Sequence, residues 1–337
     1  MSIPLAVDTS LSVSAQPSID TLVEQARWAE DAGLEHIWLP ETWGRNVVTT
    51  LTMIADRTSS IGIGASILNV YSRSPALLGQ TAVSLQEVSD GRFRLGVGPS
   101  GPAVIERWHG IPFEDPLKQT RETVEIVTKV ISGDVVDYDG DRYQLSGFRL
   151  RSTPPSPAPP VDVASMGPKA TELAGRFADG WQGLFLTPSG VRSRVDDIRR
   201  GAALGNRNPD SVRTMLSLTT AALPDGDRAR ELVRRHLAFY IGGMGTFYRD
   251  SLARQGYKER AHAIHDAWQA GDREKATDLL DEELLDRLGL AGTPERVREG
   301  LRDRWAIDGL DAVAISLPRG IEPAEVEATF KAIEPIV

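Results

Sequence analysis

The chain of 337 residues contains no cysteine and few basic side chains. The lack of cysteine excludes disulfides, thiolate metal sites and cysteine nucleophiles. There are 38 Lys and Arg residues against 47 Asp and Glu, which gives a formal net charge of −9. A nucleic-acid or anionic-membrane surface needs a concentrated basic face. We therefore expect the protein to bind neither nucleic acid nor an anionic membrane. The charge of any anionic ligand must be balanced by groups in its own binding site.

Long apolar runs are also missing, and we expect no secretory leader. The apolar runs are short and broken by glycine or charge, whereas about 20 apolar residues are needed to span a bilayer. The first ten residues, MSIPLAVDTS, lack the basic and apolar leader of a secretory signal. We expect a soluble, cytoplasmic enzyme.

Metal and hydrolase motifs are absent as well. The five histidines are scattered without metal-ligand spacing, and no HExxH run or nucleophile elbow occurs. We expect no metal site and no hydrolytic triad.

What the chain does contain is a repeated alternation of β-rich runs and amphipathic helical segments. Parallel strands need crossover helices of nearly fixed hand, so eight such units predict a (β/α)8 TIM barrel, and an open doubly wound α/β sheet is the alternative. We expect one domain over residues 1–337. The strand-like runs lie at residues 3–8, 36–39, 61–66, 93–98, 161–165, 180–185, 213–220 and 311–316.

Three segments interrupt the alternation. Residues 135–150 carry an Asp-Gly-Asp turn between strand-like runs and predict a short hairpin before strand five. The proline-rich residues 151–160 are either a linker or a bracing connection, and we favour the second because the alternation resumes at once. Residues 225–290 are charged and helical. They predict an insertion after strand seven that would also act as a lid.

Barrel enzymes carry their sites on the loops that follow the strands. Glu41 follows strand two, where a carboxylate can relay a proton or hydrogen-bond a cofactor. A surface ion pair with Arg45 is the alternative. Gly98 ends strand four in a glycine-rich run that fits neither the dinucleotide nor the P-loop motif. Close approach of the backbone to a flat ring is the favoured use of this glycine, and a tight strand end is the alternative.

The loop after strand five predicts an anion site. Ser165, Met166 and Gly167 precede a helix that begins with Pro168 and Lys169. Unpaired N–H groups and the helix dipole favour an anion there, although an ordinary turn and helix cap fit equally well. Together the loops combine small residues, hydroxyls, apolar surfaces and a few cations. This mixture suits a planar aromatic cofactor with an anionic tail.

Taken in order, these loops resemble the bacterial luciferase-like flavin and deazaflavin family, and most of all its coenzyme F420-dependent reductases and dehydrogenases. The likeness covers nearly the whole chain. The matching stretches are AGLEHIW (32–38), IGIGASIL (61–68), SPA (74–76), SDGRFRLGVG (89–98), SGP (100–102), WHG (108–110), PL (116–117), TRE (120–122), AGR (174–176), ADG (178–180) and GTPE (292–295).

The resemblance implies how the cofactor is held. A non-prolyl cis peptide, a rare bond, is expected at Ser66–Ile67, where it would back the deazaflavin ring beside Asn69 and Gly98. The backbone of Ala164, Ser165, Met166 and Gly167 would meet the cofactor's phosphate or side chain. The resemblance also implies a homodimer.

The chain departs from the family at the catalytic positions. Glu41 and Thr42 stand where many relatives carry an Asp-His pair, and the turn at residues 99–102 carries no acid. Sugar-phosphate oxidation is therefore not expected.

We expect an F420-dependent oxidoreductase in which Glu41 and Thr42 face a small-molecule substrate, such as a methylene-tetrahydropterin or another conjugated compound. An FMN-dependent monooxygenase and a non-catalytic flavin-binding relative are the alternatives.

Overall fold

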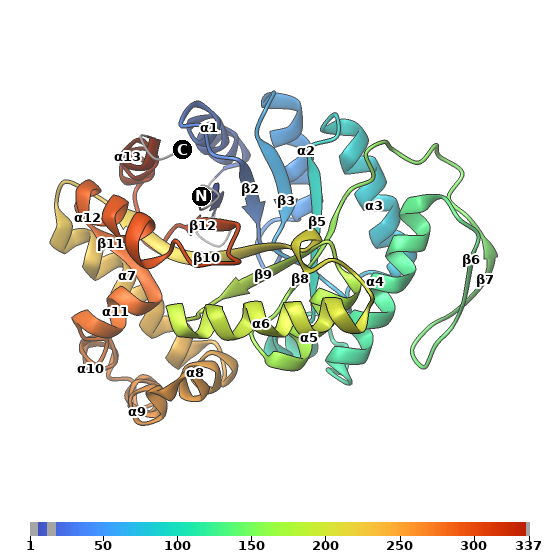
Figure 1. Cartoon of the computed structure of the whole chain (residues 1–337). Coiled ribbons are helices and arrows are strands. Elements are labelled where there is room, and N and C mark those ends of the chain that lie inside the picture. Colours follow the sequence, from blue (N-terminus) through green and yellow to red (C-terminus); the bar gives the residue numbers. More distant parts are fainter. Residues whose placement is uncertain (1–5, 12–17, 335–337) are drawn as a thin grey trace.

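Eight parallel strands close into a barrel in the computed structural model, which describes residues 6–11 and 18–334 (Figure 1). Closure is complete because β10 pairs with β9 on one side and β12 on the other, and β12 pairs with β1. The predicted TIM barrel is confirmed and the open sheet is wrong. The barrel strands are β1 (Ala6–Ser10), β2 (His36–Leu39), β3 (Gly62–Ala65), β5 (Phe93–Gly98), β8 (Val161–Ala164), β9 (Gly180–Leu184), β10 (Arg213–Ala222) and β12 (Ala312–Ser316).

The helices around the barrel begin at sequence signals that set their first turn. Ser18, Asn46, Ser74 and Thr187 each accept a backbone N–H from three residues ahead, as N-cap side chains do. Proline opens six of these helices, where its fixed φ is already helical. The helices are α1 (Ile19–Asp31), α2 (Val47–Arg57), α3 (Pro75–Val88), α4 (Pro116–Ser132), α5 (Pro168–Phe177), α6 (Pro188–Leu204), α12 (Pro294–Glu299) and α13 (Pro323–Ile333).

Charged side chains pack toward the starting ends of the barrel strands. Arg213 donates to both carboxylate oxygens of the fully buried Asp8, at 3.1 and 2.9 Å. Burial alone would raise the pKa of Asp8, but the hydrogen bond to His36 and the charge of Arg213 outweigh it, so its pKa lies below the usual range. Arg94 and Asp162 form a second buried pair. Polarity at this end of a barrel is typical of a role in stability.

The predicted hairpin is confirmed as β6 (Val136–Asp139) and β7 (Gln144–Phe148), paired antiparallel. Its turn is tied to α4 because the buried carboxylate of Glu122 accepts N–H groups from residues 141, 142 and 143. The proline-rich segment that follows lies against the barrel, since Gln86 on α3 donates to the Pro157 carbonyl at 2.9 Å.

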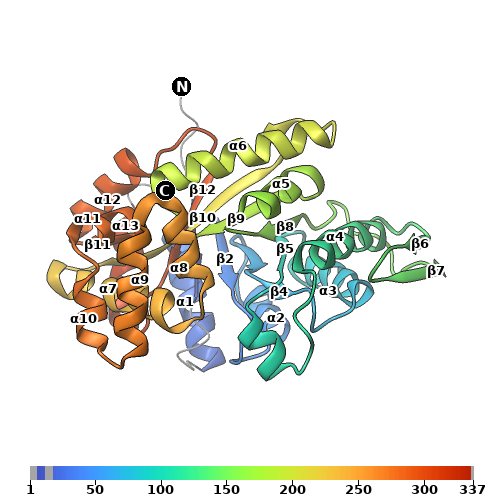
Figure 2. The ribbon, with the colours of Figure 1, turned by 90° about the horizontal axis from the view of Figure 1, so that it is seen from below.

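The region after β10 is helical, as expected, but it ends in a short strand that the sequence did not indicate. This strand, β11 (Gly289–Gly292), pairs with the end of β10. The insertion and the hairpin lie at opposite ends of the molecule (Figures 1 and 2). No described helix is both long and apolar enough to cross a bilayer. The inserted helical elements are α7 (Gly226–Gly243), α8 (Phe247–Leu252), η3 (Ala253–Tyr257), α9 (Lys258–Gln269), α10 (Arg273–Asp278) and α11 (Glu282–Leu288).

Candidate active site

The ten predicted site residues all lie at or just beyond the carboxyl ends of four strands that neighbour one another in the barrel. The order of these strands is β2, β3, β5 and β8. Parallel strands end at the same face of a barrel, so the ten residues share one arc of its mouth. Glu41 and Thr42 follow β2. Ser66, Ile67 and Asn69 follow β3. Gly98 ends β5 and Ala164 ends β8. Ser165, Met166 and Gly167 lead into α5.

The chain kinks directly after β3. The Ser66–Ile67 peptide is cis, as the family resemblance implies. The Ile67 carbonyl then accepts the N–H of Glu41 at 3.3 Å. Beyond the kink, the two-residue strand β4 (Leu68–Asn69) pairs with the end of β5. The kink thus brings the loops after β2, β3 and β5 together.

Ile67, Gly98 and Ala164 form the tightest contact among the predicted residues. A Cβ atom at Gly98 would lie 3.0 Å from Ile67 Cδ1 and 3.3 Å from the Ala164 carbonyl oxygen. These distances are at or below normal van der Waals contact. The missing side chain of Gly98 therefore lets Ile67 and the end of β8 pack closely against the end of β5.

Asn69 organises the loop that leaves this site. Its side chain is fully buried, and its Oδ1 accepts N–H groups from Tyr71 at 3.1 Å and Ser72 at 2.7 Å. Its Nδ2 lies 3.5 Å from Nε2 of His109, which follows the π-helix η1 (Ala103–Trp108). Asn69 thus links the loops after β4 and β5.

Glu41 is engaged by a residue that the sequence did not suggest. Both of its carboxylate oxygens contact the guanidinium of Arg73, with Nη2 at 2.8 Å from Oε1, and the Val47 N–H also donates to Oε1 at 3.3 Å. The two side chains are only 10% and 13% exposed. To act as a base, Glu41 would first have to give up these donors. Thr42, next in the chain, is half-buried.

Ser165 is fixed by the protein itself. Its N–H donates to the Gln182 carbonyl at 3.1 Å, and its hydroxyl lies 2.8 Å from that of Thr171. Trp181 Nε1 also donates to the Ser165 hydroxyl at 3.0 Å. The next residue, Met166, has its carbonyl held by Arg194 at 3.2 Å. Ser165 therefore shapes the loop more than it offers free donors.

The N-terminus of α5 has no such partner. Gly167 is the N-cap residue, no side chain caps the helix, and a Cβ at Gly167 would meet nothing within 4 Å. The first N–H groups of a helix have no partner within the helix. An anion can approach them here without displacing a side chain.

Aromatic side chains from the insertion cover the far side of the mouth. Phe185, directly after β9, packs against Tyr240 of α7 and Tyr248 of α8 at ring-centroid distances of 5.1 and 4.9 Å. On the other side, the ring of Phe113 lies 6.4 Å from Phe247 at the start of α8. The sequence predicted a lid from the insertion but not these residues, because helical spacing alone does not say which side chains of an inserted helix face the mouth.

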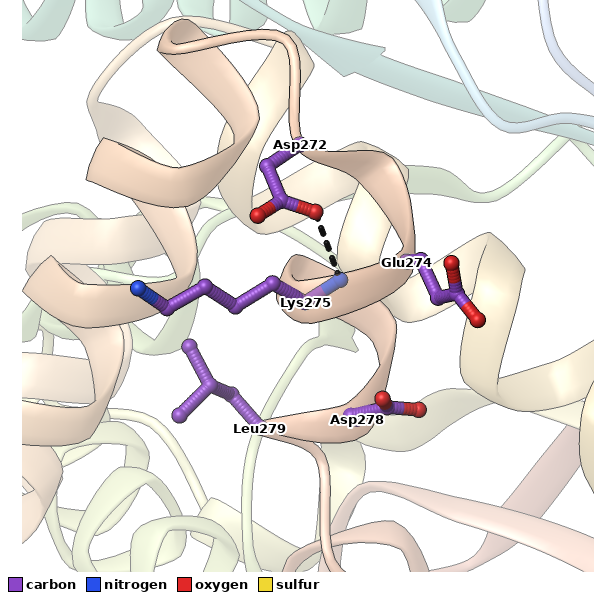
Figure 3. A pocket seen from close by; sticks show the side chains of 5 residues that line it. All are labelled: Asp272, Glu274, Lys275, Asp278 and Leu279. Carbon is purple, nitrogen blue, oxygen red and sulfur yellow. Dashed lines mark hydrogen bonds between the residues drawn. The ribbon is translucent and has the colours of Figure 1, made fainter.

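Two hollows lie away from this arc. One, of about 370 Å³, is lined only by residues 272–279 of the insertion, where Asp272 caps α10 by accepting the Lys275 N–H (Figure 3). The other, of about 580 Å³, lies at the starting ends of β2, β3 and β5. Its charged side chains are already engaged, since Arg92 donates to several backbone carbonyls and Glu30 accepts three N–H groups. Neither hollow contains a predicted site residue.

Comparison with known proteins gives consistent matches. The family model described as luciferase-like monooxygenase matches residues 1–311. A 5,10-methylenetetrahydromethanopterin reductase of Archaeoglobus fulgidus is 30% identical over 278 residues, which cover 82% of this chain and 83% of that protein.

Two solved structures share the fold. The coenzyme F420-dependent tetrahydromethanopterin reductase from Methanopyrus kandleri has a TM-score of 0.85 and 24% identity, with 99% of both chains covered. An F420-dependent secondary alcohol dehydrogenase, in complex with an F420-acetone adduct, has a TM-score of 0.80 and 19% identity, with 99% of this chain and 98% of that one covered.

Proposed function

Because the chain belongs to the luciferase-like monooxygenase family, we propose that it is a coenzyme F420-dependent oxidoreductase acting on a small organic substrate. The observation that carries this proposal is the close approach of Ile67, Gly98 and Ala164 at neighbouring strand ends, where glycine leaves the backbone bare for a flat ring. The relatives described above, which are named as F420-dependent enzymes or as a methylenetetrahydromethanopterin reductase, favour the deazaflavin as the cofactor.

Different residues at the mouth of the barrel would bind different parts of the cofactor. Ser66, Ile67, Asn69 and Gly98 would support the flat ring, because they form the kink after β3 and the bare backbone at the end of β5 beside it. The loop of Ala164, Ser165, Met166 and Gly167 would bring the anionic tail to the uncapped start of α5, with Ser165 fixing the shape of the loop and the first N–H groups of the helix as donors. When bound, the deazaflavin supplies the hydride. The protein orients the ring and excludes water.

On the substrate side, we propose roles for Glu41 and Thr42 at the exposed face of the ring. With Arg73 bound to its carboxylate, Glu41 positions a guanidinium beside the substrate. Thr42 adds a hydroxyl. The substrate is a methylene-tetrahydropterin or another conjugated compound.

We also propose that the protein is cytoplasmic and forms a homodimer. Leu77 and Val88 on α3 are 46% and 48% exposed. They are eleven residues apart, close to three full helical turns, so they share one face of the helix. Two exposed apolar side chains on one side of α3 support a contact with a second copy.

An FMN-dependent monooxygenase is the second candidate, because the description of the matching family names that activity. A flavin-binding relative without turnover is the third.

A titration of the purified protein with coenzyme F420 and, separately, with FMN tests the ranking. We expect F420 to bind at least tenfold more tightly, a difference of about 1.4 kcal/mol. Tight binding of FMN without binding of F420 would reverse the order of the two candidates. Binding of neither would contradict both.

A further inference from the structure

Two tyrosine rings from the insertion meet at the end of β9. Tyr240 and Tyr248 lie 4.9 Å apart, edge to face, and each also contacts Phe185. Met166 and Leu184 pack against the same apolar cluster. Since Met166 lies in the loop proposed to hold the cofactor and Leu184 ends β9, the tyrosine pair adjoins the mouth of the barrel.

The hydroxyl groups of Tyr240 and Tyr248 have no hydrogen-bond partner among the described residues, 6–11 and 18–334. Neither hydroxyl oxygen is completely shielded from solvent. Burial nevertheless raises the pKa of both phenols above the usual range, although the charge of Arg319 partly opposes this for Tyr240. A phenolic hydroxyl without a protein partner can donate its hydrogen bond to water or to a ligand.

The backbone beside the pair is held in an uncommon conformation. Phe185 has a φ of +55°, in the left-handed region that non-glycine residues seldom adopt. Gln255 of η3 donates to the Phe185 carbonyl at 3.1 Å and accepts the Thr187 N–H at 2.8 Å. Such conformations persist where the surroundings fix them, and they cluster at functional sites.

The apolar surroundings indicate the chemistry that the pair can serve. The rings of Phe185 and His236 contact Tyr240, and His236 stays neutral because burial lowers its pKa to about 3. Arg319 is the charged group that faces this cluster, with its guanidinium 4.2 Å above the ring of Phe239. Two neutral donors near one cation can stabilise negative charge that develops on an oxygen atom.

We propose that Tyr240 and Tyr248 are catalytic residues that bind the carbonyl oxygen of a conjugated ketone, enone or quinone substrate. This proposal rests on the proposed function. The carbonyl carbon of a ketone, or the β carbon of an enone or quinone, gains a C–H bond by accepting hydride, with its electron pair, from the reduced deazaflavin, which is thereby oxidised. A quinone adduct then loses this proton to water as it tautomerises to the hydroquinone. The carbonyl π bond breaks, and its oxygen takes a proton from one tyrosine while the other donates a hydrogen bond. Water then returns the proton to the phenolate.

The test uses the full-length protein with reduced coenzyme F420 and two acceptors, 2-cyclohexen-1-one and menadione. Tyr240→Phe and Tyr248→Phe remove one hydroxyl each and retain the ring. Loss of one donor to a developing oxyanion typically lowers kcat by about 100-fold. We expect kcat to fall at least tenfold in each variant, with KM and the coenzyme Kd changed less than threefold. The solvent deuterium isotope effect on kcat should rise, because proton transfer becomes slower.

Tyr138→Phe is the matched control, since Tyr138 lies on β6 and bonds Glu125. This variant should retain wild-type kcat. Wild-type kcat in both mouth variants would overturn the proposal. So would tight coenzyme binding with reduction of neither acceptor, which would exclude the carbonyl substrate class. Failure of the wild-type protein to bind F420 at all would instead refute the proposed function, and this inference with it.

Discussion

At the scale of single residues, His236 shows how strongly the fold controls protonation. This side chain of α7 is 8% exposed, and its Nδ1 accepts the backbone N–H of Arg319 at 3.0 Å. Burial, assisted by the charge of Arg319, lowers its pKa from 6.5 to about 3. The folded protein therefore keeps this imidazole neutral at pH values where the unfolded chain protonates it.

This shift predicts a specific loss of stability in acid. Between pH 6.5 and about 3 the unfolded chain binds one more proton than the native state at this site, so stability falls as the pH falls. We expect this residue to lower the free energy of unfolding by up to about 1.4 kcal/mol per pH unit below 6.5. Urea unfolding of wild type and His236→Gln at pH 7, 6 and 5 measures the difference.

His262→Gln, on the half-buried face of α9, is the control and should follow the wild type. Parallel pH dependence of the wild type and His236→Gln would show that His236 is not the source.

Gly98 and Glu41 illustrate which properties of a single residue can be predicted from the sequence. Gly98 could be recognised because a glycine at the end of a barrel strand has few uses other than close approach. The pairing of Glu41 with Arg73 could not, since the two are 32 positions apart and meet through the kink after β3. No periodicity in the sequence encodes such a contact.

At the scale of elements, the insertion is joined to the barrel mouth by Gln255. Its side chain accepts the N–H of Thr187, the N-cap of α6, and donates to the carbonyls of Phe185 and Ser251. One residue of η3 thus satisfies backbone groups on two segments. A buried backbone group left without a partner costs about 1–3 kcal/mol.

Gln255→Ala should therefore loosen the insertion locally. We expect hydrogen exchange to speed up at least tenfold around Phe185, Thr187 and α8, with the strands β1 to β5 unaffected, because local opening is governed by local contacts. Gln269→Ala is the comparison, since Gln269 bonds Gly242 within the insertion. If both variants exchange alike at Thr187, the docking role of Gln255 is refuted.

Long periodic elements could be located from sequence, whereas short ones could not. The eight barrel strands and the hairpin were placed within a few residues. The two-residue strand β4 and the strand β11 were missed, because a run such as Gly-Leu-Ala-Gly has no alternation to read. Their pairing depends on the strands beside them.

At the scale of the whole molecule, closure of the barrel decides which loops meet. β2, β3, β5 and β8 are consecutive in the barrel, so loops up to about 120 residues apart in the chain line one arc. The ordered series of loop motifs made this arc predictable. The sequence predicted that the insertion would act as a lid, but not which of its residues reach the mouth, since only the folded barrel brings α7 and α8 against the end of β9.

The most direct test of the proposed cofactor site compares Gly98, at the end of β5, with Gly101 in the loop that follows. A Cβ at Gly98 would press on Ile67 and the Ala164 carbonyl, whereas a Cβ at Gly101 would meet nothing within 4 Å. Measured by fluorescence titration, coenzyme F420 should bind Gly98→Ala about tenfold more weakly than wild type, or about 1.4 kcal/mol, and should bind Gly101→Ala unchanged. Equal, wild-type affinity in both variants would contradict a cofactor ring seated against the strand ends at Ile67, Gly98 and Ala164.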